Sequence, residues 1–323
     1  MVHSVAIVGL GGIGMLYDFK LPEAEYVHSH ARAFFLHPDF EIVGAVDIQA
    51  KLRDQFSGKY KDAAFSSVAE LGLQCSPDVV VVASPTNTHR AVIEQVLQHC
   101  KPKLILCEKP LAYSTEHAQA IVQQCHKQGV QLFVNYFRRA DPGVMEVKTR
   151  LTSGRIASPF KAVVWYSKGL LHNGSHLLDL MTFWFGPVKA MAIITPGRDI
   201  GEQDAEPDFR VEFETGKAIF CSCKEENFSH YTVEVVAQNG RLRYEQGGVI
   251  EWQIAGPHPT LDKYRQLQAE AETIANNMSH YQYRVADQLS LALKKPTHTL
   301  CTGDSGLTNI QTLVTLLKDR IKL

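Results

Sequence analysis

The sequence offers little that would suit a membrane, nucleic acid or an oxidising compartment. No apolar run reaches the length of a membrane span, and a formal net charge of −1 gives no basic surface for nucleic acid or acidic lipid. The seven cysteines are scattered and odd in number, which favours reduced packing thiols over a disulfide framework. The first residues, MVHSVAIVGLGGIG, lack the basic region and cleavage site of a signal peptide. We therefore expect a cytoplasmic protein that binds neither nucleic acid nor membranes.

A metal-binding motif is also missing. His172 and His176 are spaced four apart, and His28 and His30 lie close together. The first histidine of the former pair precedes the predicted helix, however, and no carboxylate completes an HExxH pattern. We therefore predict no metal site.

Length and composition indicate an ordinary globular protein of more than one domain. The chain has 323 residues, which is more than one hydrophobic core usually serves. It is 45% hydrophobic and 21% charged, which argues against long disordered segments. We expect two domains.

The first 138 residues alternate between buried strands and amphipathic helices. Helical patterns at 89–100 and 114–127 separate the later apolar runs of strand length. This alternation is typical of βαβ units and predicts a dinucleotide-binding α/β Rossmann domain over 1–138. The predicted strands are 4–8, 41–47, 78–84, 103–108 and 130–136.

The pattern changes after residue 138. A predicted helix at 143–152 is followed by strand-like stretches with hairpin signals between them, of which Asn239-Gly240 is the strongest. Two more helices, 281–294 and 304–321, are predicted at the end. This order predicts a substrate-binding α+β domain with a mostly antiparallel sheet over 139–323. The predicted strands are 160–167, 189–195, 209–215, 218–224, 231–238, 241–246 and 249–255.

A glycine-rich loop follows the first predicted strand. It reads GLGGIG and fits the pattern GxGxxG, which is informative here because it opens the first βαβ unit. Its glycines permit a tight turn and the close approach of a pyrophosphate, while the following helix N-terminus supplies amides. We expect the pyrophosphate of the cofactor to bind here, at Gly9, Gly11, Gly12, Ile13 and Gly14.

Asp47 ends the second predicted strand, where a carboxylate accepts hydrogen bonds from the adenosine ribose and repels a 2′-phosphate. No basic residue follows directly, and Arg53 is the nearest downstream arginine. The sequence therefore predicts NAD as the cofactor, with NADP less suited.

Asp47 lies 33 positions after Gly14 (47 − 14), whereas the usual spacing is about 20. We interpret residues 15–30, which include the helix-breaking Pro22, as an insertion at the mouth of the cofactor site.

Two more loops follow strand ends. SPTNTH at 84–89 follows the third predicted strand, and EKP at 108–110 follows the fourth. Ligands of doubly wound sheets bind beyond the carboxyl ends of the strands, so a lysine there is placed to contact a cofactor or a substrate oxygen. The predicted cofactor contacts are Ser84, Pro85, Thr86, Asn87, His89, Glu108, Lys109 and Pro110.

The chain resembles the glucose–fructose oxidoreductase/inositol dehydrogenase family, often called Gfo/Idh/MocA. The matching segments are VGLGGIG, the strand-end Asp47, ASPTNTH, CEKPLA and HLLDLMTFWFG, and their order covers nearly the whole chain. The resemblance implies NAD(P)-linked hydride transfer at a hydroxyl or keto carbon of a sugar, nucleotide sugar or cyclitol. It also implies that Lys109 contacts both nicotinamide and substrate, and that His176 is the general acid/base.

His176 also suits this role on chemical grounds. Oxidation of an alcohol needs a group to take the hydroxyl proton, and imidazole titrates near neutral pH. We expect His176 to begin a helix, whose dipole would favour the neutral imidazole. The family commonly has an aspartate four residues earlier; here that position is His172, which we expect to orient the substrate or hydrogen-bond His176. The predicted substrate contacts are Lys109, Asn135, Arg138, Asn173 and His176.

Two alternatives to a sugar-type dehydrogenase stay open. A reductase of a non-sugar substrate would use the same fold, and His172 in place of the aspartate suits a non-catalytic NAD-binding protein. In each case the ligand is a small molecule.

The predicted strands AVVWYS and AIFCSCK carry apolar residues at both odd and even positions, so neither face of the sheet is fully polar. With the resemblance, this predicts a homodimer or homotetramer packed sheet to sheet.

Overall fold

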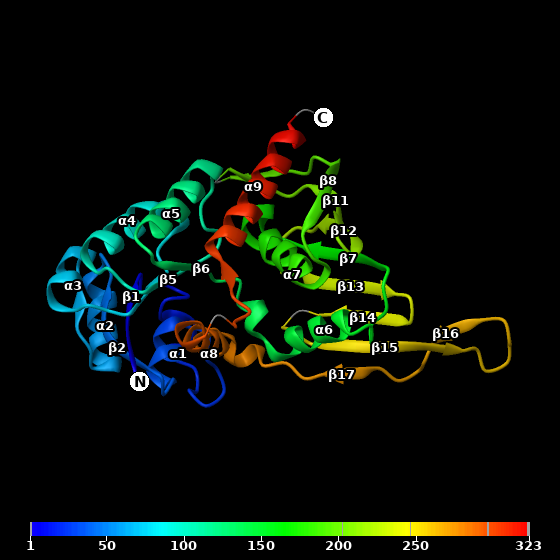
Figure 1. Cartoon of the computed structure of the whole chain (residues 1–323), viewed down its shortest axis with the longest axis horizontal. Helices are drawn as coiled ribbons and strands as arrows, with labels where there is room; N and C mark the ends of the chain where they lie inside the picture. The colour runs from blue at the N-terminus through cyan, green and yellow to red at the C-terminus, as the bar shows by residue number, and fades with distance from the viewer. Residues whose placement is uncertain (1, 202, 246, 296, 322–323) are drawn as a thin grey trace. The chain divides into compact units, whose positions relative to one another are not determined.

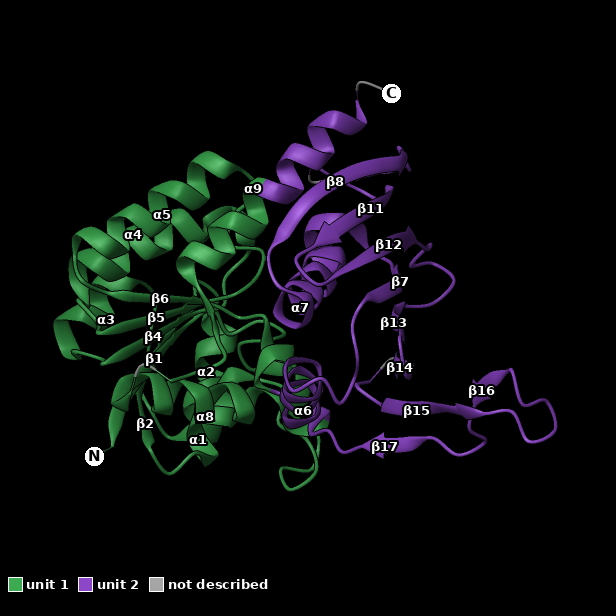
Figure 2. Ribbon diagram, turned by 45° about the vertical axis from the view of Figure 1, so that its right-hand side comes forward, with its two compact units in different colours: residues 1–140, 279–311 green, residues 141–278, 312–323 purple. Residues whose placement is uncertain are grey.

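The computed structural model describes residues 2–201, 203–245, 247–295 and 297–321. They form two compact units, and each unit combines two separate parts of the chain (Figure 2). Unit 1 contains Met1–Ala140 and Ser279–Gln311, and unit 2 contains Asp141–Met278 and Thr312–Leu323. The predicted division into 1–138 and 139–323 differs from these units mainly in residues 279–311, which group with unit 1.

Unit 1 is built on a sheet of seven strands in the described residues, in the order β18-β6-β5-β4-β1-β2-β3. β1 to β6 run parallel, and β18 pairs antiparallel with β6. The order β3-β2-β1-β4-β5-β6 is that of a doubly wound dinucleotide-binding fold, which confirms the predicted Rossmann architecture. The strands are β1 (His3–Val8), β2 (Phe40–Val46), β3 (Ala64–Phe65), β4 (Val79–Val82), β5 (Leu104–Cys107), β6 (Gln131–Val134) and β18 (Cys301–Thr302).

Helices cover both faces of this sheet (Figure 2). Burial on both faces explains why β4 consists of four buried valines. On one face lie α1 (His30–Leu36), α2 (Ala50–Tyr60) and α8 (Tyr281–Lys294), whose apolar residues share a core with β1. The remaining helices are α3 (Val68–Gln74), α4 (His89–His99) and α5 (Thr115–Lys127). The five predicted strands and the helices at 89–100, 114–127 and 281–294 are confirmed.

Unit 2 contains a nine-stranded sheet in the described residues, in the order β16-β15-β14-β13-β7-β12-β11-β8, with β17 paired to β15 (Figure 1). Only β7 and β12 pair in parallel among its ladders, so the predicted mostly antiparallel sheet is confirmed. Its strands are β7 (Phe160–Tyr166), β8 (Val188–Thr195), β11 (Asp208–Phe213), β12 (Gly216–Ser222), β13 (Tyr231–Ala237), β14 (Gly240–Tyr244), β15 (Ile250–Pro257), β16 (Arg265–Leu267) and β17 (Glu272–Ile274). A separate pair is formed by β9 (Asp199–Gly201) and β10 (Asp204–Ala205).

The hairpin between β13 and β14 is placed one residue away from its prediction. Ala237 pairs with Gly240, so the two turn residues are Gln238 and Asn239. The Asn239 side chain fixes this turn, because it accepts a hydrogen bond from the Ala157 N–H at 2.8 Å. Tertiary contact has therefore overridden the preference of Asn-Gly for the two central positions.

The inner face of the nine-stranded sheet packs against two helices. These are α6 (Pro142–Thr152) and α7 (Ser175–Phe185), and Trp184 of α7 donates its indole N–H to the Val144 carbonyl at 3.1 Å. The last helix, α9 (Gly303–Arg320), has residues in both units.

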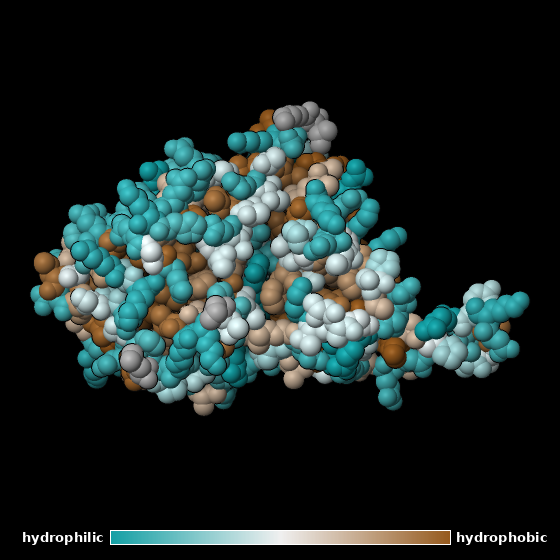
Figure 3. Space-filling view, in the orientation of Figure 1, coloured by the Kyte–Doolittle hydropathy of each residue, from teal (hydrophilic) through white to brown (hydrophobic). Residues whose placement is uncertain are grey.

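The turn between β15 and β16 is mainly hydrophilic on the face that Figure 3 shows. No helix within the described part of the chain is long and apolar enough to cross a membrane.

Candidate active site

The phosphate loop has the shape that a pyrophosphate requires. Gly9 has φ of +100°, and a Cβ there would lie 2.6 Å from the Ala83 carbonyl oxygen. A Cβ on Gly14 would lie 2.0 Å from the Gly9 carbonyl oxygen, so the loop closes tightly on itself. A Cβ on Gly11, in contrast, would meet no atom within 4 Å. The loop is therefore open at the second motif glycine, where a phosphate approaches the backbone.

The helix after this loop is interrupted. The carbonyls of Ile13 and Gly14 accept hydrogen bonds from the amides of His30 and Ala31, at 3.0 and 2.9 Å. Each donor lies 17 positions after its acceptor (30 − 13 and 31 − 14), whereas an α-helical donor lies four positions on. The helix therefore contains 13 additional residues (17 − 4). Without them, Asp47 would lie 20 positions after Gly14 (33 − 13), which is the usual spacing.

Asp47 is joined to the phosphate loop. Its carboxylate accepts hydrogen bonds from the N–H groups of Leu10 and Gln49, both at 2.8 Å. The carboxylate retains lone pairs for ribose hydroxyls. Arg53 lies closer to this position than its sequence distance indicates, because α2 brings its guanidinium to the carbonyls of Asp47 and Ile48, at 2.9 and 3.1 Å.

The loop after β4 is braced by its own side chains. The Thr88 hydroxyl donates to Ser84 Oγ at 2.8 Å or to the Pro85 carbonyl at 2.7 Å. Pro85 and Asn87 are exposed and Thr86 is half-buried, so these predicted cofactor contacts are accessible. His89 is buried, and its ring nitrogens face the carbonyls of Ser84 and Leu111 at 2.9 and 3.2 Å. Burial lowers the pKa of His89, and its ring links the loop after β4 to the loop after β5.

The turn after β5 carries the predicted Glu108, Lys109 and Pro110. Glu108 accepts hydrogen bonds from His30 Nε2 at 2.8 Å and from the Asn135 side-chain amide at 2.6 Å. Burial raises the pKa of Glu108, but these hydrogen bonds and the charges of His30 and Lys109 outweigh burial and hold it below its usual value. An ionised carboxylate therefore lies next to Lys109, which is half-buried.

The predicted substrate contacts in unit 1 lie in buried surroundings. Asn135 is 1% exposed and also donates to the Gln282 side chain at 3.3 Å, so it positions Glu108 rather than presenting an open surface. Arg138 is 7% exposed, and its guanidinium lies 4.8 Å from the centre of the Phe137 ring. The Phe137 ring lies 4.4 Å from Tyr281 of α8.

In unit 2 the histidines lie on a continuous helical path. Residues Gly169–Gly174 form a π-helical turn that runs directly into α7, so His172 is in the π turn and His176 is in the first turn of α7. α7 thus begins one residue before His176, close to the expected position, but the argument from a free helix N-terminus does not apply because the π turn precedes it. Sequence periodicity misses this turn because π turns are rare, although they are frequent at functional sites.

A buried carboxylate holds the π turn. Asp204 of β10 accepts hydrogen bonds from the backbone N–H groups of Leu171 at 2.9 Å and His172 at 3.1 Å. Burial raises the pKa of Asp204, and these N–H groups counteract the effect. A Cβ on Gly169 would lie 2.1 Å from an Asp204 oxygen, so the turn accepts only glycine there. The predicted residues Asn173 and His176 are buried beside it, and His172 is half-buried.

The structure thus forms two groups of candidate residues. The first, in unit 1, surrounds the phosphate loop and the Lys109 turn, and the second, in unit 2, contains His172, Asn173 and His176. Sequence analysis missed His30, Gln282 and Asp204, because each reaches its partner only through long-range packing. Among the described residues, no group of three or more His, Cys, Asp or Glu side chains is placed to hold a metal ion.

Comparison with known proteins agrees with this geometry. Residues 3–136 match the GFO_IDH_MocA family, described as "Oxidoreductase family, NAD-binding Rossmann fold". An inositol 2-dehydrogenase from Rubrobacter xylanophilus is 28% identical over 172 residues, which cover 53% of this chain and 46% of that enzyme. The chain thus matches less than half the length of this relative.

Solved structures match over the whole fold. An oxidoreductase from Agrobacterium radiobacter, in complex with NAD+, L-tartaric acid and magnesium, has a TM-score of 0.76 and 18% identity, and the match covers 99% of this chain and 97% of that one. The WlbA dehydrogenase from Bordetella pertussis, in complex with NADH and UDP-GlcNAcA, has a TM-score of 0.76 and 19% identity, covering 98% and 96%. The family match supports the resemblance to the Gfo/Idh/MocA oxidoreductases over residues 3–136, and the solved structures show that the fold is shared over nearly the whole chain.

Proposed function

We propose that the protein is an NAD-dependent dehydrogenase that transfers a hydride to or from a hydroxyl-bearing or keto carbon of a sugar, nucleotide sugar or cyclitol. The observation that carries this proposal is the Lys109 turn at the carboxyl end of β5, in the same sheet as the open phosphate loop. The related inositol dehydrogenase and the complex with UDP-GlcNAcA support the substrate class.

Lys109 has the central role in the proposed chemistry. Its ammonium group donates hydrogen bonds to the substrate oxygen and stabilises negative charge that develops there during hydride transfer. The negative charge of Glu108 lies beside this lysine, and His30 and Asn135 hold that carboxylate in place. A bound nicotinamide cofactor supplies the hydride acceptor or donor.

His176 is the proposed general acid/base. Its imidazole takes the hydroxyl proton on oxidation and returns it on reduction. His172 and Asn173 orient the substrate, and the backbone of this segment is held by Asp204.

The experiment that tests the function is a substrate screen followed by NADH absorbance. Purified protein is incubated with NAD and a panel of cyclitols, aldoses and UDP-sugars, and in reverse with NADH and the keto compounds. Turnover of one class, lost in Lys109→Ala, supports a dehydrogenase. Turnover only with non-sugar carbonyl compounds would favour the alternative reductase. Tight NAD binding without turnover of any compound would favour a non-catalytic binding protein.

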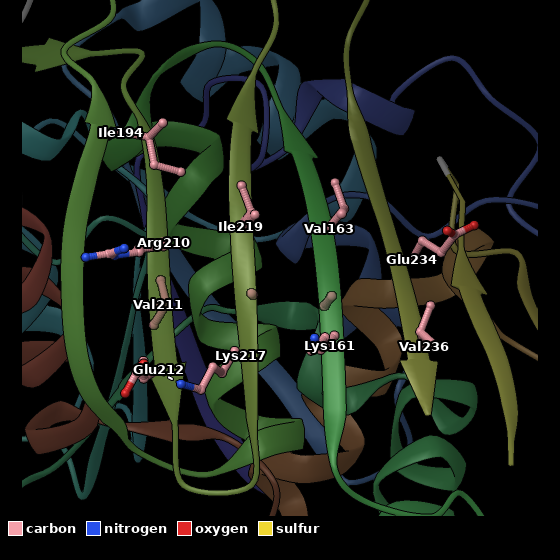
Figure 4. A pocket seen from close by; sticks show the side chains of 12 residues that line it. Lys161, Val163, Ile194, Arg210, Val211, Glu212, Lys217, Ile219, Glu234 and Val236 are labelled. Carbon is pink, nitrogen blue, oxygen red and sulfur yellow. Dashed lines mark hydrogen bonds and ion pairs between the residues drawn. The ribbon is translucent and has the colours of Figure 1, made fainter. Parts of the chain in front are cut away.

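We propose further that two or four copies associate through the outer face of the nine-stranded sheet. Figure 4 shows the centre of this face, where Val163, Ile219 and Val236 point outward from β7, β12 and β13. Ile219 and Val236 are 44% and 53% exposed. Charges of both signs surround them, including Lys217 and Glu212, and such a surface is complementary to a second copy of itself.

A further inference from the structure

The 13 additional residues in the phosphate-binding helix place an aromatic ring on the phosphate loop. A Cβ on Gly12 would lie 2.5 Å from Cε1 and 2.8 Å from Cζ of Tyr17. The Tyr17 ring therefore rests directly on the Gly12 α-carbon. This contact accounts for a glycine at position 12, which the GxGxxG pattern does not require.

Tyr17 remains 60% exposed although its ring contacts the backbone. Large aromatic side chains normally bury their area, so an exposed ring at this position is not explained by packing alone. The neighbouring Gly11 is the open position of the loop, where a Cβ would meet nothing within 4 Å. The ring therefore lies on the residue that directly follows this open position.

The backbone under Tyr17 is rigidly held. The next residue, Asp18, is fully buried and accepts hydrogen bonds from the His28 and Ser29 amides at 2.6 and 2.8 Å. Arg32 of α1 is also buried, and its guanidinium donates to the Tyr26 carbonyl at 2.9 Å and to the Asp18 carbonyl. An internal ion pair, with Arg32 Nε 3.7 Å from Asp18 Oδ1, thus joins the start of the inserted segment to the helix that follows it.

We infer that Tyr17 is a wall of the pyrophosphate site, and that the inserted segment serves to hold its ring beside Gly11. The inference rests on the proposed binding of a nicotinamide dinucleotide at this loop. A ring in that position excludes water from one side of the pyrophosphate, which strengthens the hydrogen bonds from the loop amides in their less polar surroundings. The ring, rather than the hydroxyl, is the part that contacts the loop.

Calorimetric titration with NADH and with ADP-ribose tests this role without a substrate. ADP-ribose contains the pyrophosphate but lacks the nicotinamide. Tyr17→Ala is expected to weaken both ligands by about tenfold, which corresponds to about 1.4 kcal/mol. Tyr17→Phe is expected to bind both within about twofold of the natural protein, since it keeps the ring. Tyr26→Ala is the matched control, because this tyrosine of the same segment packs against His28 and is expected to leave both affinities unchanged.

Other outcomes would overturn the inference. Unchanged or tighter binding by Tyr17→Ala would mean that the ring is not a wall of an occupied site. A loss for NADH alone would place Tyr17 at the nicotinamide end, and an equal loss in Tyr17→Phe would assign the contact to the hydroxyl. If the natural protein binds neither NADH nor NADPH nor ADP-ribose, the proposed function itself is wrong, and the inference is wrong with it.

A second measurement tests the contact in the absence of ligand. Gly12→Ala introduces a methyl group against the Tyr17 ring and is expected to lower the melting temperature. In the Tyr17→Ala background the same change is expected to cost clearly less, because the ring that obstructs the methyl group has been removed. Equal costs in both backgrounds would show that the ring does not rest on Gly12 in solution.

Discussion

The carboxylate of Asp47 accepts a hydrogen bond from the backbone N–H of Leu10 at 2.8 Å, and so links the end of β2 to the phosphate loop. We expect NADH to bind at least about tenfold more tightly than NADPH, because a 2′-phosphate would meet this carboxylate. Asp47→Ala is expected to remove most of the preference and to weaken NADH. Calorimetry with both cofactors measures the change. Since Arg53 lies beside Asp47, equal binding of both cofactors that becomes NADH-selective in Arg53→Ala would contradict our assignment.

Replacing Lys109 is expected to lower turnover strongly while leaving the fold intact. Loss of one positioned charged contact in an active site commonly costs about 10²–10³-fold in rate. Steady-state kinetics on the substrate found in the screen, with circular dichroism as the check on folding, measures this effect. Lys127→Ala is a suitable control, since this lysine is exposed near the end of α5. An unchanged rate in Lys109→Ala would show that Lys109 has no role in turnover.

His176 and His172 are expected to affect different kinetic constants. His176→Ala should lower kcat by about 10²-fold or more and flatten its pH dependence near neutrality, because the proton acceptor is lost. His172→Ala should act mainly on KM, because this residue orients the substrate. The comparison is made across pH with both variants under identical conditions. A larger loss of kcat in His172→Ala would reverse the two roles.

Stability in acid is expected to depend on Asp39, which precedes β2. Hydrogen bonds from Lys294 and Ser290 of α8 lower the pKa of Asp39 from 3.8 to about 2. A lowered pKa means that the folded state favours the carboxylate, so the stabilisation is complete above pH 4 and is lost as the pH falls towards 2. Asp39→Asn should therefore melt a little earlier at pH 6, and the difference should shrink between pH 4 and 2. Thermal melts across this range measure it, and a constant difference would contradict the assignment.

A charge on the outer sheet face is expected to separate the copies. Ile219→Lys places an ammonium group in the centre of the proposed interface, where a second copy would have to bury it. Light scattering at micromolar concentration should give a dimer or tetramer for the natural protein and a monomer for the variant. Leu73→Lys is the control, because Leu73 is 83% exposed on α3 and far from the sheet in sequence. A natural protein that is monomeric would refute the interface.

Local pattern predicted most of the elements but not the contacts between distant ones. Runs such as Val79–Val82 are apolar because the sheet is covered on both faces, so their sequence alone identifies them. The two-residue strands β3 and β18 are too short to leave a periodic signal. In the candidate site, too, local features could be predicted from the sequence and long-range contacts could not. The phosphate loop and the Lys109 turn follow predicted strand ends, whereas the pairing of His30 with Glu108 depends on packing between residues 78 positions apart.

The grouping of residues 279–311 with unit 1 has a consequence for synthesis of the chain. The ribosome releases β1 to β6 early, but α8, which buries Val285 and Leu289 in the same core, emerges only near the end. Until then the apolar surface that α8 covers beside α1 and α2 stays exposed, and one edge of β6 has no partner. The dinucleotide-binding unit, although it begins first, is therefore completed only after residues 141–278 of unit 2 have been made.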